Sequence, residues 1–201
     1  CNDRTFPGVS HTVYTNMDER QLVKSCLKGK PAAQKELYDR FAEQMLGVCY
    51  RYTKSLADAE DVLQDGFVKV YRFLHTYQFE GPLGAWIRRI MVTTALNFLK
   101  KHSRYRTDLS FDNNDALHPV VENDAEVRMT ARELAELIRQ LPTGYQTIFN
   151  LHAVEGFTHV EIGSMLGISD GTSRSQYARA RSLLISWVEK KSQIKNDHYA
   201  G

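Results

Sequence analysis

The sequence predicts an all-α fold: two small helical domains joined by a flexible acidic linker, the second a winged-helix-like, helix-turn-helix domain of four helices. Apolar residues recur at spacings of three and four along most of the chain, as on the buried stripe of a helix. No stretch of alternating Val, Ile and Thr is long enough to predict a strand. A run rich in Asp and Glu interrupts the helical pattern, which predicts a boundary between two domains.

The bulk composition is that of an ordinary soluble globular protein. The 201 residues are 42% hydrophobic and 25% charged, which disfavours wholesale disorder. Three cysteines without a C-x-x-C pair disfavour a disulfide framework or a structural zinc site and indicate reduced thiols. No apolar run approaches the roughly 18 residues that a membrane span needs, and no signal peptide is visible. We therefore expect a cytoplasmic protein without membrane insertion.

The first domain is expected over residues 18–106, after a polar, flexible N-terminal extension at 1–17. A short helix from Asp18 ends at Gly29-Lys30-Pro31, and its apolar face is expected to carry Leu22, Cys26 and Leu27. Longer helices follow over about 32–53, 55–76 and 85–101. The apolar side of the second of these is expected to hold Ala59, Val62, Phe67, Val70, Phe73 and Leu74.

Charge changes sign abruptly after the first domain. Residues 83–107 carry six Lys or Arg and no acid, whereas residues 108–127 carry six Asp or Glu and no Lys or Arg. We interpret 107–127 as an acidic linker, although a solvated loop without a role would have the same composition. The second domain is expected over 128–195, with a flexible tail at 196–201.

The most informative local pattern runs from Phe157 to Leu184 and predicts a helix-turn-helix. Thr158 and Glu161 have the spacing of a capping box, in which each side chain satisfies a backbone amide of the other. Gly167 stands where a tight turn requires positive φ, and Ser169 is placed to cap the following helix. We expect that following helix to cover about 171–184.

This second helix of the pair is expected to have two faces. Tyr177, Ala180, Leu183 and Leu184 would pack inward. The outward face would present Arg174, Ser175, Gln176, Arg179 and Arg181, residue types that suit base edges and phosphates in a major groove. The alternative is a solvated Arg-rich helix within a bundle. The capping box, the turn glycine and the basic helix occur in register, which favours DNA binding.

Two further surfaces are indicated in the first domain. Asp61, Gln64 and Asp65 lie together at helical spacing and could meet a basic partner, although acids near a helix N-terminus also stabilise the helix itself. Downstream, aromatic residues precede a basic helix, a combination that suits an unpaired DNA strand. Core packing is an equal alternative for Trp86, whereas Tyr77 and Phe79, in a Gly/Pro loop, are expected to be exposed.

In the order of these elements the chain resembles the extracytoplasmic-function (ECF) sigma factors of the sigma-70 family, over about Asp18 to Lys191. The combination that carries the resemblance is DAEDVLQ at 58–64, WIRRI at 86–90, and GTSRSQ followed by RAR at 171–181. The resemblance implies that 18–106 is sigma region 2 and 128–195 is sigma region 4. It also implies as partners the β and β′ subunits of core RNA polymerase and promoter DNA, and leaves room for an anti-sigma factor.

The resemblance divides the candidate residues into three sets. It implies that core polymerase is bound by Asp61, Gln64 and Asp65. It implies that the −10 element is bound and melted by Tyr77, Phe79, Trp86, Arg88, Arg89, Asn97, Lys100 and Lys101. It implies that the −35 duplex is recognised by Arg174, Ser175, Gln176, Arg179 and Arg181.

The chain departs from the family pattern at three positions. Thr93 stands where Asn is common, Gln176 where Arg is common, and Gly163 where Ala is common. The departure at Thr93 puts the part of that position in DNA handling in doubt, and the departure at Gln176 is expected to change which bases are preferred. Gly163 is expected only to loosen its helix, by up to about 1 kcal/mol.

Other function classes find less support in the residues. The histidines are scattered, and no catalytic, metal or cofactor motif occurs, so we expect neither an enzyme nor a cofactor. A helix-turn-helix regulator of the two-component output type would need alternating strands and helices in its N-terminal half. A helical adaptor without DNA contact is the remaining alternative. Salt-dependent DNA binding would distinguish a DNA-binding factor from such an adaptor.

Overall fold

The computed structural model describes residues 18–102 and 129–199, with side chains as far as residue 191. Every regular element within these ranges is helical and none is a strand, so the predicted all-α class is confirmed. The expected N-terminal extension at 1–17 and the expected acidic linker at 107–127 lie outside the described residues.

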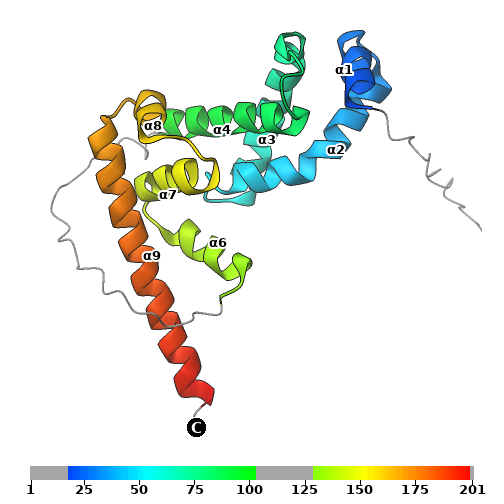
Figure 1. Cartoon of the computed structure of the whole chain (residues 1–201). Helices are drawn as coiled ribbons and strands as arrows, with labels where there is room; N and C mark the ends of the chain where they lie inside the picture. Colours follow the sequence, from blue (N-terminus) through cyan, green and yellow to red (C-terminus); the bar gives the residue numbers. More distant parts are fainter. Residues whose placement is uncertain (1–17, 103–128, 200–201) are drawn as a thin grey trace, which may run out of the picture.

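The N-terminal half consists of α1 (Glu19–Leu27), α2 (Pro31–Tyr50), α3 (Leu56–Phe73) and α4 (Leu83–Lys101), with a 3₁₀ turn, η1 (Leu74–Thr76), after α3. The long helices α2, α3 and α4 all pack against one another, and α1 lies across the start of α2 (Figure 1). This arrangement exposes one side of α3 and one side of α4.

Local chemistry explains where these helices begin. The Ser55 side chain accepts a hydrogen bond from the backbone amide of Asp58 at 3.1 Å and so caps α3. Pro31 opens α2, where its missing amide hydrogen leaves no helical bond unmade. Both boundaries agree with the pattern in the sequence.

The C-terminal half consists of α6 (Ala131–Gln140), α7 (Thr143–Phe149), a π-helical turn η2 (Asn150–Val154), α8 (His159–Leu166) and α9 (Asp170–Tyr199). A capping box of Thr130 and Glu133, which the sequence analysis missed, starts α6. The last helix is much longer than expected: its 30 residues span about 45 Å at about 1.5 Å per residue. Figure 1 shows its final turns extending away from the rest of the molecule.

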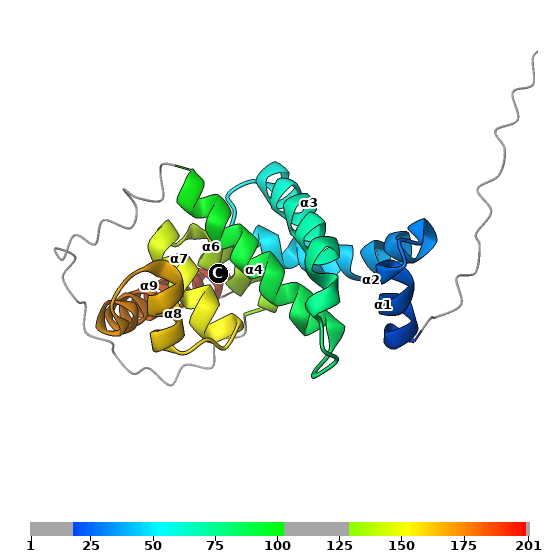
Figure 2. The same ribbon diagram turned by 90° about the horizontal axis from the view of Figure 1, so that it is seen from above.

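The two halves share one apolar core. Ile148, Leu151, Ile162 and Leu166 of the C-terminal half belong to the same buried cluster as the cores of α1 to α4. A second, smaller cluster holds α6 against α9 through Leu137, Leu141, Ala180 and Leu184. Seen from above, α4 runs between α3 on one side and the helices of the C-terminal half on the other (Figure 2).

Two expected core positions are wrong. Leu27 in α1 and Phe73 at the end of α3 are 51% and 44% exposed. Both belong to the apolar face of their helix, but the packing leaves each of them partly open to solvent. Val23, by contrast, is fully buried in α1.

Candidate nucleic-acid interface

The acidic side of α3 is open to solvent. Asp61, Gln64 and Asp65 are all exposed, whereas the intervening Val62 and Leu63 are buried. Val68, one turn further along, is 65% exposed and extends this side with an apolar group. The arrangement suits a partner that offers basic groups and some apolar surface.

The loop before α4 is folded around Tyr77. Tyr77 was expected to be exposed, and this is wrong: its side chain is 9% exposed and its hydroxyl donates to the carbonyl oxygen of Gly81 at 2.5 Å. The rings of Phe79 and Trp86 lie 4.8 and 5.6 Å from the Tyr77 ring, centre to centre. Burial, followed by the nearby carboxylate of Glu19, raises the pKa of Tyr77. Tyr77 therefore supports the loop.

Phe79 is held in a strained backbone conformation. Its φ of 62° lies in the left-handed region, which a bulky side chain rarely adopts. The guanidinium of Arg20 in α1 lies 5.3 Å from the Phe79 ring centre, a cation–π distance. The ring stays half exposed. Helix α1 thus helps to present an aromatic face at the tip of the loop, a contribution that sequence reasoning did not identify.

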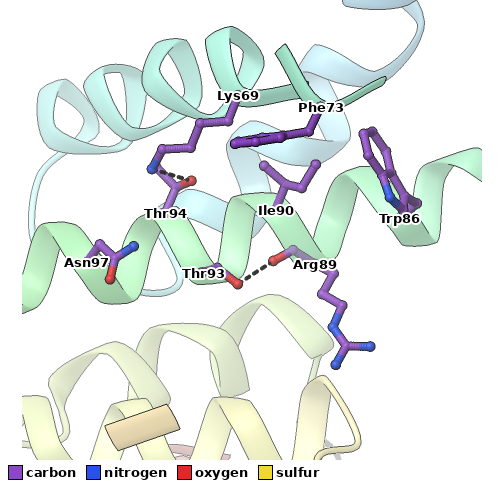
Figure 3. A pocket seen from close by; sticks show the side chains of 8 residues that line it. All are labelled: Lys69, Phe73, Trp86, Arg89, Ile90, Thr93, Thr94 and Asn97. Carbon is purple, nitrogen blue, oxygen red and sulfur yellow. Dashed lines mark hydrogen bonds between the residues drawn. The ribbon is translucent and has the colours of Figure 1, made fainter. Parts of the chain in front are cut away.

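A hollow of about 350 Å³ lies between α3 and α4. Figure 3 shows Phe73 and Lys69 projecting from α3 over side chains of α4, with Trp86 at one end and Asn97 at the other. The Lys69 ammonium donates to the Thr94 hydroxyl at 3.1 Å, and the Thr93 hydroxyl donates to the carbonyl oxygen of Arg89. An apolar floor with a polar rim is typical of ligand pockets.

The structure brings together Trp86, Arg89 and Asn97 of the predicted −10 set around this hollow. It does not place all of that set there. The guanidinium of Arg88 is paired with Glu155 of the C-terminal half, a hydrogen bond that raises the pKa of Arg88. Lys100 and Lys101, at the end of α4, are exposed. The basic side of α4 therefore faces partly toward solvent and partly toward the C-terminal half.

The helix-turn-helix predicted from the sequence is present in α8 and α9. Thr158 and Glu161 form the complete capping box, and Gly167 has a φ of 73°. The Ser169 hydroxyl accepts a hydrogen bond from the Thr172 amide at 2.9 Å and caps α9. The prediction about Gly163 is wrong: its β-carbon would lie 2.8 Å from the carbonyl oxygen of Ile168. Gly163 thus allows the close approach of the turn to α8.

The exposed side of α9 carries most of the predicted −35 set. Arg174, Ser175 and Arg181 are exposed and Arg179 is half exposed. Arg174 donates to the carboxylate of Asp170 at 2.8 Å, which lowers the pKa of Asp170. The expectation that Gln176 faces outward is wrong, because its side chain is 2% exposed. Four of the five residues therefore form one basic and polar surface.

Among the side chains described, in residues 18–102 and 129–191, no three His, Cys, Asp or Glu residues gather closely enough to hold a metal ion. None of the described helices combines the length and the apolar character that crossing a bilayer requires.

Comparison with known protein families assigns both halves. A model of sigma-70 region 2 matches residues 37–105, and a model of sigma-70 region 4 matches residues 131–184. Together these matches cover more than half of the chain. The chain belongs to the sigma-70 family. It is an ECF sigma factor, and its function is promoter-specific initiation of transcription through RNA polymerase.

Similar proteins align with this sigma factor over most of their length. The RNA polymerase sigma-H factor of Pseudomonas aeruginosa is 28% identical over 180 residues, which cover 85% of this chain and 93% of that protein. The ECF RNA polymerase sigma-E factor of Haemophilus influenzae is 28% identical over 188 residues, 86% of this chain and 96% of that protein. In the solved complex of the sigma factor RpoE with the anti-sigma factor NepR from Bartonella quintana, the matched chain is 18% identical. The match covers 77% of this chain and 96% of that one, with a TM-score of 0.49.

The sigma factor contains one further group of charged residues that sequence reasoning missed. Arg51 and Arg88 of the N-terminal half both bind Glu155 of the C-terminal half. In the sequence, Glu155-Gly156 indicates only the end of a helix. Because Arg51 and Glu155 are 104 positions apart, no local pattern could have paired them.

Proposed function

We propose that this sigma factor divides its work among three surfaces and acts by binding alone, as a cytoplasmic protein that catalyses no reaction of its own. Region 2 would occupy 18–106, the acidic linker 107–127 and region 4 128–195. The β and β′ subunits of core RNA polymerase and promoter DNA are its partners. An anti-sigma factor is a further proposed partner, since a similar chain has been solved with one.

The acidic side of α3 is the proposed contact with core polymerase. Asp61, Gln64 and Asp65 would dock on the clamp helices of β′. Their common exposure supports this assignment, as does the neighbouring exposed Val68, since interfaces combine charged and apolar groups. Within the described part of the chain, the side chains of these three residues make no recorded hydrogen bond or ion pair.

The loop and the basic side of α4 are the proposed −10 surface. Trp86 at the hollow and Phe79 in the loop before α4 offer aromatic faces, and bases leaving the duplex would exchange base stacking for contacts with them. Arg88, Arg89, Asn97, Lys100 and Lys101 would bind backbone phosphates and base edges. Tyr77, which is buried, would hold the loop in place through its contacts inside it. In this scheme, strand opening is driven by binding energy.

The exposed side of α9 is the proposed −35 surface. Arg174, Ser175, Arg179 and Arg181 would enter the major groove, where guanidinium groups bind guanine edges and phosphates. Gln176 is left out of this surface because it is buried. Gln176 is one of the three departures from the family pattern, and in this proposal it does not contact bases directly.

One observation carries the proposal: the aromatic and basic side of α4 lies inside the region 2 match, and the helix-turn-helix lies inside the region 4 match. Photo-crosslinking in a reconstituted promoter complex tests it. A crosslinking amino acid at Trp86 should label the −10 element and one at Ser175 the −35 element. A crosslinker at Glu136, on exposed α6, is the control and should label neither. Labelling of one element by both positions would overturn the division.

A further inference from the structure

A carboxylate from one half of the molecule is clamped by two arginines from the other. Glu155, in the turn after η2, accepts hydrogen bonds from Nε and Nη2 of Arg88 at 2.5 and 3.0 Å. Nη2 of Arg51 approaches the same carboxylate at 3.3 Å. The Glu155 side chain is only 4% exposed, whereas the two arginine side chains are about one third exposed. The arginines thus form an anion site that reaches the surface.

Other polar contacts hold the C-terminal half on the end of α2. Gln146 and Asn150 both donate to the carbonyl oxygen of Arg51, at 2.8 and 2.9 Å. Arg139 donates to the carbonyl oxygen of Thr53 at 3.2 Å. The last carbonyl groups of a helix lack partners within it, so these donors satisfy groups that would otherwise need water. These polar contacts fix the position of the C-terminal half beside the apolar core that the two halves share.

This docked arrangement is incompatible with simultaneous reading of two promoter elements. Lys100 of α4 donates to the carbonyl oxygen of Met165 in α8 at 2.8 Å, so the proposed −10 helix touches the helix-turn-helix. The centres of the −10 and −35 elements are about 25 base pairs apart, or about 85 Å at roughly 3.4 Å per pair. The halves must therefore separate. The 26 residues between His102 and Met129 could span at most about 90 Å, at about 3.5 Å per residue.

We propose that Glu155 occupies the place of a DNA phosphate on Arg51 and Arg88, so that the docked chain blocks its own DNA site and promoter DNA competes with Glu155. The proposal rests on the proposed role of α4 in DNA binding and adds Arg51 to the residues that bind DNA. Carboxylate and phosphate oxygens accept the same forked hydrogen bonds from a guanidinium, so one anion can replace the other.

Buried polar atoms around the clamp favour its opening. Among the described residues, Nε of Arg51, the hydroxyl of Tyr52 and Oδ1 of Asn150 are buried without a hydrogen-bond partner. Separation of the halves would return these atoms to water, which removes a cost of the docked state. The apolar contacts of Ile148, Leu151, Ile162 and Leu166 act in the opposite direction. The docked state is thus a closed form that a competing anion can open.

The test uses the full chain without polymerase and a fluorescein-labelled 12-nucleotide oligothymidine as the probe. Glu155→Gln removes the competing charge and should bind the probe about tenfold more tightly, if about a tenth of the wild-type chain is open. The slope of log K against log salt should become steeper by about 0.7, the value for one added phosphate contact on a single strand. Glu136→Gln, the same change at an exposed residue of α6, should bind like wild type.

Arg51→Gln in the Glu155→Gln background separates the phosphate site from simple opening. This double variant should lose the added affinity and the steeper slope. If Glu155→Gln binds no more tightly than Glu136→Gln, or if the double variant binds like Glu155→Gln, the proposal is overturned. Circular dichroism should show wild-type helix content for all variants.

Wild-type protein provides a measurement that needs no substitution. Saturating oligothymidine should increase the radius of gyration measured by small-angle scattering, since Arg51 and Arg88 cannot hold Glu155 and DNA together. Bound DNA without expansion would overturn the proposal. Transcription with core polymerase tests the proposed function separately. If the chain starts transcription but fails the tests above, only the competition between Glu155 and DNA is refuted. If the chain never starts transcription, the proposed function itself is refuted.

Discussion

A β-carbon on Gly163 in α8 would lie 2.8 Å from the carbonyl oxygen of Ile168 in the turn that follows. The obstacle is backbone, which cannot rotate away as the end of a long side chain could. The amide of Ile168 also donates to the carbonyl oxygen of Gly163 at 3.0 Å, so the turn is held at this distance. The geometry of the helix-turn-helix therefore depends on a glycine here.

Gly163→Ala should destabilise the C-terminal half, although alanine favours helices. We expect a loss of about 1–3 kcal/mol, the usual cost of forcing extra atoms into a packed site. Urea unfolding followed by circular dichroism measures it. Gly171→Ala is the matched control: its β-carbon would meet only the Ser169 hydroxyl oxygen, at 3.7 Å, and stability should not fall. Equal stability of the two variants would contradict the steric role of Gly163.

Arg174→Ala and Arg179→Ala should each weaken binding of the −35 element by about 1–3 kcal/mol if they contact bases. Gln176→Met should leave that binding unchanged, because Gln176 is buried and its Oε1 has no partner among the described residues. Replacement of a buried amide whose oxygen is unpaired by an apolar group of similar shape should leave stability unchanged or raise it. Holoenzyme binding to −35 variants, with thermal unfolding, checks all three. A Gln176→Met chain with altered base preference would place Gln176 in the groove after all.

Asp61→Lys should reduce binding of core polymerase at least as strongly as any single change on α3, since it reverses a charge on the proposed contact. Because the side chain is exposed, the melting temperature should change little. Glu136→Lys, an equal charge reversal on exposed α6, is the control and should bind core polymerase normally. Loss of binding together with loss of helical signal would point to unfolding instead.

Stability should fall as the pH drops below about 6.5, and His159 should contribute to the fall. The rings of His152 and His159 stack 4.2 Å apart, and His159 contacts the Ser173 hydroxyl at 2.9 Å through Nδ1. Burial, followed by the charge of His152, lowers the pKa of His159 from its ordinary 6.5. The unfolded chain therefore binds the proton first, and stability is lost as the pH falls from 6.5 toward the lower folded value.

Thermal unfolding between pH 7.5 and pH 5 measures this dependence. His159→Gln should show a smaller loss of stability over this range than wild type, whereas His75→Gln, at an exposed position, should match wild type. Identical pH profiles for His159→Gln and wild type would remove the histidine pair as a cause.

Features that depend on neighbouring residues could be predicted from the sequence. The caps at Ser55 and at Thr158 with Glu161, and the turn at Gly167, are set by residues within a few positions. The fold class and the order of the helices follow from such local patterns. The acidic side of α3 was equally readable, because helical spacing alone decides which residues share a face.

Burial that depends on distant partners could not be predicted. Tyr77 stands in a Gly/Pro loop, yet aromatic neighbours and the Gly81 carbonyl oxygen draw it inward. Gln176 looks like its exposed neighbours but falls on the inner side of a helix that packs against α7 and α8. The clamp of Glu155 joins residues 67 and 104 positions apart, and the docking of the halves has no periodic signature.

Reconstituted transcription tests the central claim most directly. The chain is combined with core RNA polymerase of its source bacterium and a genomic DNA library, and transcript start sites are mapped. The account predicts that the chain binds core polymerase and starts transcription at a restricted set of promoters that core polymerase alone does not use. A chain that neither binds core polymerase nor changes where transcription starts would contradict the account.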